Sequence, residues 1–268
     1  MFGWLRGSGS AREIPQAQWQ EVLERHPFIA TRAAAELGRL RELAGHFLAA
    51  KEFHGAQGFV ITDAVALTIA AQAVLPLLHL ALAGNPRAAL RWYDDFVGIV
   101  VHPDEVVARR SIADEAGVVH DYSEVLAGEA MDGGPVMLNW KDVAAASETA
   151  SRGYNVVIHE FIHKIDLRDG EADGCPPLRS SAHREQWRAT IGEEYERFRE
   201  QVIMAERFGG ETPWLDAYGA ESVSEFFAVA GEAYFVNRSR FQEVFPLLAM
   251  LFDSFFDPAR SAVGPQAR

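Results

Sequence analysis

Cysteine is almost absent from this sequence, and basic residues are scarce relative to acidic ones. The single cysteine, Cys175, allows no disulfide within the chain, so nothing points to a protein built for an oxidising compartment. The 25 Lys and Arg residues are outweighed by 38 Asp and Glu residues, which gives a formal net charge of -13. Because phosphate binding needs concentrated basic side chains, we expect no nucleic-acid partner.

Features that would direct the chain into a membrane are also sparse. The apolar stretch at residues 1–6 is brief for a signal peptide, and Gly and Ser residues follow it at once. Residues 64–83 are apolar and about as long as a bilayer span, but three polar side chains and Pro76 interrupt them. We therefore expect a buried helix bent at the proline, or two short helices, in a cytoplasmic protein without a membrane partner.

The remaining composition is that of an ordinary globular protein, with 49% hydrophobic and 24% charged residues and no internal repeats. Helical periodicity dominates and short strand-like runs are few, which predicts an α+β, helix-rich fold with a small sheet. We expect one domain over residues 1–258, with a helical part at about 16–95 and a catalytic part at about 96–258. Residues 259–268 are expected to form a flexible tail.

The predicted elements follow from periodicity, proline and glycine. Helices are expected at 16–51, after Trp140, from Asn155 through the central motif, and at 183–208, 221–234 and on to 256. Strands are expected at 58–62, 96–101 and 136–140, with loops and short strands at 105–130 and a loop at 170–181.

The strongest indication of chemistry is the HExxH segment His-Glu-Phe-Ile-His at residues 159–163. On a helix, His159 and His163 lie on one face, so both imidazoles can bind one zinc ion at about 2.0–2.1 Å. Glu160 is rotated by about 100° from His159, so its carboxylate lies beside the metal and can act as general base. We therefore predict one Zn²⁺ per chain in a zinc-dependent peptidase.

Two alternatives compete with zinc at this motif. A chance match occurs in on the order of a few per cent of chains of this composition. A buried histidine pair satisfied by neighbouring groups would also fit the pattern. The surrounding residues are apolar, however, and burying a glutamate and two histidines without strong partners is costly. Zinc supplies such a partner for all three.

A catalytic zinc needs a third protein ligand and one open position. Asp169 lies six residues after His163, as in the metzincin motif, but Asp166 stands where that motif requires glycine. The favoured source is the predicted helix at 221–234, where one face carries three carboxylates at spacings of four and seven: Glu221, Glu225 and Glu232. One of them would be the ligand and another its supporting partner. Spacing does not choose among them, and a solvated acidic stripe is the simpler alternative.

Four blocks of the sequence resemble the Mlc titration factor A family, a group of bacterial gluzincin-type zinc peptidases. The blocks lie at residues 57–59, 134–140, 153–166 and 216–229, and the similarity extends from near the N-terminus to about residue 250. The resemblance implies a zincin-like fold, Glu225 as the third zinc ligand, and a role for Tyr218. It also implies a peptide substrate, chiefly aminopeptidase-like activity, and a repressor of sugar uptake as a possible partner.

Several further hypotheses concern the surroundings of the motif. The Tyr218 hydroxyl could stabilise negative charge on the peptide carbonyl oxygen, and Asp166 could orient a ligand imidazole. Residues 136–140 are either an edge strand that pairs with substrate or a plain core strand. The Gly- and Pro-containing loop at 170–181 is a candidate autoinhibitory segment.

Two functions other than an active peptidase fit the same residues. A regulatory binding protein could keep the zinc fold and act by sequestering a partner, but it has no need of Glu160. A structural-zinc protein would want four closed protein ligands. Beyond the two histidines, only carboxylates are available.

Overall fold

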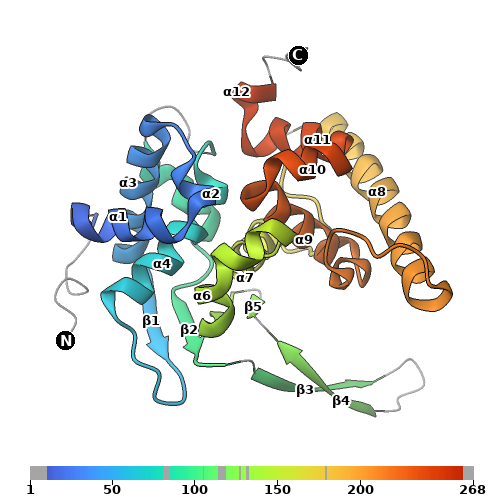
Figure 1. The fold of residues 1–268 in the computed structure, drawn as a ribbon, viewed down its shortest axis with the longest axis horizontal. Coiled ribbons are helices and arrows are strands. Elements are labelled where there is room, and N and C mark those ends of the chain that lie inside the picture. Colours follow the sequence, from blue (N-terminus) through green and yellow to red (C-terminus); the bar gives the residue numbers. More distant parts are fainter. Residues whose placement is uncertain are drawn as a thin grey trace.

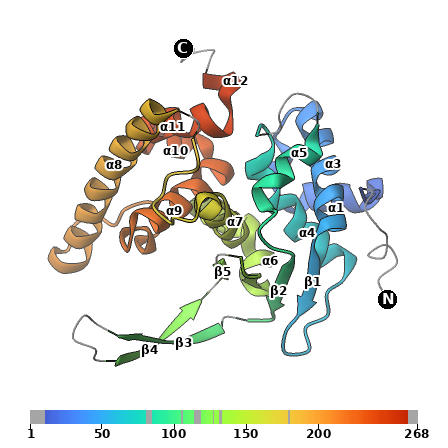
Figure 2. The ribbon, with the colours of Figure 1, turned by 180° about the vertical axis from the view of Figure 1, so that it is seen from behind.

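The structure of the protein is a computed structural model that describes residues 11–80, 85–104, 106–113, 119–126, 128–130, 133–178 and 180–261. Helices from the two ends of the chain lie on opposite sides of a central helix, α7 (Val156–Asp166), as Figures 1 and 2 show. The N-terminal helices cover one side of α7. The long helix α8 and the C-terminal helices cover the other.

Three helices form within the segment predicted to be helical at 16–51: α1 (Gln16–Arg25), α2 (Pro27–Ala30) and α3 (Ala34–Ala50). The helix α4 (Asp63–Ala73) follows in the apolar segment, and the short helix α5 (Pro86–Ala89) forms where no helix was predicted. The apolar segment becomes α4 and a 3-10 turn at Leu75–Leu77 that contains Pro76, so the prediction of short buried helices is confirmed for its described part. Residues 81–84 lie outside the described residues. No helix in the described part of the chain is both long enough and apolar enough to span a bilayer.

A four-stranded sheet with the order β1-β2-β6-β5 supports α7. Its parallel strands are β1 (Glu52–Gly55), β2 (Gly98–His102) and β6 (Val136–Asn139). The strand β5 (Gly128–Ala130) pairs antiparallel with β6 and forms one edge. The small sheet agrees with the predicted α+β class.

One strand prediction is wrong, and the structure decides between the two alternatives for another strand. No strand forms at 58–62, because Gln57 and Gly58 adopt φ values of 53° and 80° and turn the chain after β1. Thr62 then caps α4 by accepting a hydrogen bond from the Val65 N–H at 3.2 Å. The strand at 136–140 is interior rather than an edge, since β2 and β5 flank it.

The region expected to contain short strands forms longer ones. The strands β3 (Val106–Ala113) and β4 (Val119–Leu126) pair antiparallel over eight residues each. In both views this pair extends away from the helical body.

The second half of the chain is helical: α6 (Trp140–Thr149), α8 (Ser181–Phe208), α9 (Val223–Val236), α10 (Arg238–Val244), α11 (Pro246–Phe256) and α12 (Pro258–Ser261). Gly209, with φ 70°, ends α8 as the sequence predicts. The start of the predicted flexible tail is helical in α12, whereas residues 262–268 lie outside the described residues.

The core is rich in aromatic rings around α7 and α9. Phe161 of α7 packs against Phe47 and Tyr93, with ring centroids 5.6 and 4.9 Å apart. On the other side, Phe226 of α9 stacks on Phe198 of α8 at 5.3 Å. These contacts hold the two helices rigidly, because buried rings make many dispersion contacts and leave little room for displacement.

Candidate metal centre

Helix α7 places His159 and His163 on one face. The helix begins at Asn155, whose side-chain carbonyl accepts a hydrogen bond from the Ile158 N–H at 2.9 Å. The apolar residues of the segment are buried around it. The four-residue spacing brings the two imidazole rings to a centroid separation of 4.7 Å.

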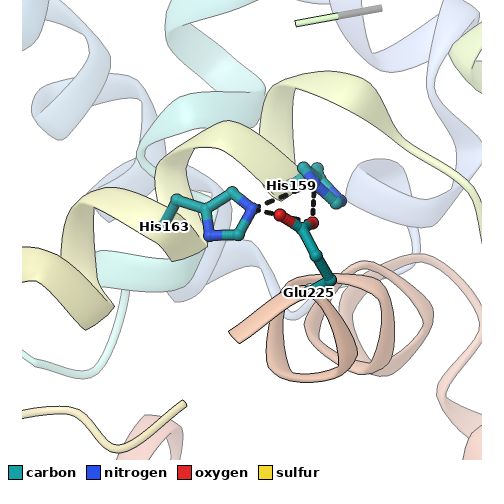
Figure 3. Close-up of side chains that lie close together, drawn as sticks. All are labelled: His159, His163 and Glu225. Atoms are coloured by element: carbon teal, nitrogen blue, oxygen red, sulfur yellow. Dashed lines mark hydrogen bonds and ion pairs between the residues drawn. The ribbon is translucent and has the colours of Figure 1, made fainter. Parts of the chain in front are cut away.

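Glu225, near the start of α9, completes a triangle of ligand atoms (Figure 3). Its Oε2 atom lies 3.2 Å from Nε2 of both His159 and His163, and the two Nε2 atoms are 3.1 Å apart. Ligand atoms at about 2.0–2.1 Å from a tetrahedral zinc are about 3.3–3.4 Å apart. These three side chains therefore could hold a metal ion, and their nitrogen and oxygen donors suit zinc.

A buried carboxylate orients His159 from behind. Oε1 of Glu232, which is 1% exposed, lies 2.8 Å from His159 Nδ1, and its Oε2 accepts the Asn155 backbone N–H. Burial raises the pKa of Glu232, although the hydrogen bonds to His159 and to the Asn155 N–H act to lower it. Because each of its oxygens lies against a nitrogen that can donate, the site suits the ionised carboxylate. His159 then carries its proton on Nδ1 and leaves the lone pair on Nε2 for a metal.

A second relay orients His163. Ser224 donates a hydrogen bond to Oδ2 of Asp166 at 2.7 Å, so its oxygen is left to accept from Nδ1 of His163 at 3.4 Å. The Gly174 N–H also donates to Asp166 at 3.0 Å. Burial raises the pKa of Asp166 to about 6, although the Ser224 and Gly174 hydrogen bonds lower it. Asp166 thus acts on His163 through Ser224.

With both Nδ1 atoms used as donors, two lone pairs and a carboxylate converge on one point. Such an arrangement is repulsive unless a positive charge lies between them. Burial lowers the pKa of His159, but hydrogen bonds to Glu225 and Glu232 raise it well above its usual value. Burial raises the pKa of Glu225, and the two histidines lower it well below its usual range. The residues present therefore fit a bound cation.

The two predicted catalytic residues neighbour His159, Glu160 in sequence and Tyr218 in space. Glu160 follows His159 on α7 and is 3% exposed. Tyr218 lies on a 3-10 turn at Ala217–Ala220, called here the Tyr218 turn, and its ring centroid is 6.1 Å from that of His159. The turn is fixed at one end by Asp216, which accepts the Tyr218 N–H at 3.0 Å, and at the other by Tyr195, which donates to the Ala220 carbonyl at 3.1 Å.

Two carboxylates considered as ligands lie elsewhere. Glu221 precedes α9, which starts at Val223, so it does not share a helical face with Glu225 and Glu232. Asp169 is exposed at the end of a 3-10 turn at Leu167–Asp169. Neither belongs to the metal-binding group found among the described residues.

The sequence did not identify three polar residues behind the centre. Ser224 connects Asp166 to His163, and Asn155 both caps α7 and donates through Nδ2 to Gln72 at 2.7 Å. Gln72 in turn donates to the Thr68 carbonyl at 3.1 Å within α4. Its occurrence inside an otherwise apolar helix was the available signal, since a buried amide requires partners.

Comparison with known proteins agrees with this centre. Residues 3–257 match the family described as "Glucose-regulated metallo-peptidase M90". The chain is also 29% identical, over 259 residues, to proteins named Mlc titration factor A from Yersinia enterocolitica, Yersinia pestis and Yersinia pseudotuberculosis. The alignments cover 96% of this chain and 91%, 90% and 90% of these relatives. Since the family match extends over nearly its whole length, the chain belongs to the glucose-regulated metallo-peptidase M90 family, as its sequence blocks suggest.

Proposed function

We propose that the protein is a zinc-dependent peptidase in which His159, His163 and Glu225 hold the metal. The observation that carries the proposal is the convergence of two Nε2 atoms and one carboxylate oxygen within 3.2 Å of one another. Membership of a metallo-peptidase family supports it. Three protein ligands leave a position for water or substrate, as a catalytic zinc requires.

In this proposal, the zinc ion and the side chains around it have separate roles in amide hydrolysis. A bound zinc ion supplies Lewis acidity toward water and the peptide carbonyl. Glu160 accepts the proton of the attacking water and returns it to the leaving amine. The Tyr218 hydroxyl stabilises the negative charge that develops on the carbonyl oxygen.

The proposed substrate is an extended peptide with a free α-amino group. The strand β5 packs near α7 and is an edge strand, so its outer side offers backbone groups for pairing with a peptide. Asp216 and Glu221 flank the Tyr218 turn, and their negative charges favour a positively charged N-terminus. Both features support aminopeptidase-like activity.

The test compares zinc-loaded native protein with Glu160→Gln on a panel of chromogenic aminoacyl and peptide substrates. Glu193→Gln, an exposed change on α8, is the matched control. We expect Glu160→Gln to retain zinc and to lose at least about 100-fold in kcat, because general-base catalysis contributes about 10²–10⁴. Equal activity of native protein and Glu160→Gln would refute the role of Glu160.

The names of the relatives favour a second function. Proteins called Mlc titration factor A match this chain over most of their length. Following the family resemblance, we propose that this chain binds a repressor, in the cytoplasm, alongside or instead of peptide hydrolysis. Glu160→Gln separates the two functions. Undiminished binding of purified repressor by this variant would support an independent docking role, and absence of binding by the native protein would reject the repressor as partner.

A further inference from the structure

A cavity of about 560 Å³ lies at the far end of α9 from the metal centre. Glu225 lies near the start of α9, whereas Phe235 and Val236 at its end line the cavity, and ten residues of helix span about 15 Å. The opposite wall comes from the chain around α2, with contributions from α10 and α12. Cavities of about 300–1,000 Å³ are typical of small-molecule sites.

Three arginines from separate elements line this cavity: Arg32, Arg238 and Arg260. Arg238 donates to Asp253 at 2.6 Å, and Arg260 donates to Asp257 at 3.0 Å. No carboxylate among the described residues forms an ion pair with Arg32.

The acidic residue that lines the cavity, Glu36, interacts with groups other than Arg32. Its carboxylate accepts the Ala33 N–H at 3.0 Å and lies 3.0 Å from Nε2 of His79. Arg32 is therefore the guanidinium without a direct counterion.

Several guanidinium donors of the cavity also lack acceptors. Nε of Arg32 and both Nε and Nη1 of Arg238 are shielded from solvent, and no described residue accepts a hydrogen bond from them. Burial lowers the pKa of Arg32, which Glu36 only partly offsets. Unsatisfied buried donors are unfavourable, and positive charge that water does not screen attracts anions strongly.

The other lining residues define the size and polarity of a ligand. Phe28 and Phe235 supply apolar surface, while Thr31 and Ser239 supply hydroxyl groups. We propose that this cavity binds a small organic anion, with a carboxylate or phosphate group held by Arg32 and an apolar body against the two phenylalanines. Guanidinium groups bind both kinds of anion through paired N–H donors.

The test uses phenylphosphate and phenylacetate as probes and phenylacetamide as the uncharged analogue, titrated into full-length protein at constant ionic strength. Binding is followed by calorimetry and by the Nε–Hε resonances of ¹⁵N-arginine-labelled protein. We expect at least one anion to bind, to shift the Arg32 and Arg238 resonances, and to bind at least tenfold more tightly than phenylacetamide. The ratio between the two anions distinguishes phosphate from carboxylate as the preferred group.

Arg32→Gln should weaken anion binding at least tenfold, and Arg207→Gln, an exposed change at the end of α8, should leave it unchanged. Thermal unfolding of both variants checks that they fold. If Arg32→Gln does not fold, the resonance shifts in native protein decide alone. Absence of binding by both anions, equal binding of phenylacetamide, or equal effects of the two variants would overturn the proposal.

Discussion

At the scale of single residues, the metal centre depends on the groups that contact Nδ1 of each histidine, opposite the Nε2 atom that faces the metal position. Glu232 fixes the tautomer of His159 directly, and Asp166 fixes that of His163 through Ser224. A carboxylate in contact with a ligand imidazole also raises its basicity, so Glu232 contributes more than the longer serine relay.

Replacing Glu232 by Gln should lower zinc affinity by about 10–100-fold, because the neutral amide cannot accept from both His159 and the Asn155 N–H. Competition with a chromophoric chelator measures the affinity. Glu193→Gln serves as control, and an unchanged dissociation constant for Glu232→Gln would contradict the orienting role.

Ser224→Ala should also weaken zinc binding, by about tenfold, since it disconnects Asp166 from His163. The cobalt-substituted protein gives a second readout, because its visible spectrum reports ligand geometry. We expect an altered spectrum in Ser224→Ala. An identical spectrum together with native affinity would show that the relay does not orient His163.

His26 makes stability depend on pH. It is 2% exposed between α1 and α2, and neither ring nitrogen has a hydrogen-bonding partner among the described residues. Burial, with a smaller effect of Arg25, lowers the pKa of His26 from 6.5 to about 4. The unfolded chain therefore binds the extra proton first as pH falls, and stability is lost between about pH 6.5 and 4.

From pH 7 to 5 this loss is roughly 2 kcal/mol for one such histidine. Urea unfolding at the two pH values should show a smaller decrease for His26→Gln than for native protein by about this amount. His54→Gln, whose side chain is 62% exposed, is the control and should follow the native protein. An equal decrease in all three proteins would rule out His26.

At the scale of elements, the distance between α7 and α9 sets the distance between the ligands. Gly231 of α9 lies against Ile162 of α7, where an added Cβ would be 2.9 Å from Cγ1 of a fully buried side chain. Any larger residue there forces the buried Ile162 side chain or the two helix backbones to shift.

Gly231→Ala should therefore lower both stability and zinc affinity. Overpacking costs about 1–3 kcal/mol, which outweighs the gain of about 1 kcal/mol in helix propensity. Gly192→Ala on α8, where an added Cβ meets nothing within 4 Å, should instead be stabilising. Chemical unfolding and zinc titration of both variants provide the test, and a stabilised Gly231→Ala with native affinity would contradict it.

The sequence predicted the longer helices well and the short strands poorly. The positions of α8 and α7 follow from apolar periodicity and, for the end of α8, from the glycine at 209, both of which are local signals. Whether 136–140 forms an edge or an interior strand depends on β5, a partner of three residues without a periodic pattern. Glu221 was grouped with the other glutamates because the helix was expected to begin at residue 221. The helix begins at 223 instead, since the Ser222 side chain caps it by accepting the Glu225 N–H.

At the scale of the whole molecule, the metal joins distant parts of the chain. Glu225 lies 62 residues after His163, and α8 intervenes. Since the ligands meet only in the folded protein, zinc should bind the native state and hardly the unfolded one.

Removing zinc by dialysis against a chelator should therefore lower the melting temperature, and restoring it should reverse the change. At free zinc 100 times its dissociation constant, the stabilisation is about 2.7 kcal/mol. Calorimetry of native protein and of Glu225→Gln tests this. A melting temperature of native protein that is insensitive to zinc would contradict a centre built from these three residues.

From residue spacing alone, the site was predictable only where its residues lie close in sequence, and Glu225 and Tyr218 were assigned through the family resemblance instead. HExxH places two histidines and a glutamate on one helix, so five residues suffice to propose a zinc site. Ser224, Asn155 and Gln72 join the network through contacts between elements, such as the one 83 residues apart between Asn155 and Gln72. Such pairs leave no spacing signal in a single sequence.

The separation of the ligands also bears on how this family can diversify. The chain leaves the metal at the end of α7 and returns at the Tyr218 turn, and the distal end of α8 beyond Val202 is largely exposed and lies away from the core (Figure 1). Insertions, deletions and sequence drift at residues 203–212 would leave Ile162 and Gly231 in contact. Descendants of one ancestor can therefore differ in length and surface at this end while inheriting the same metal geometry.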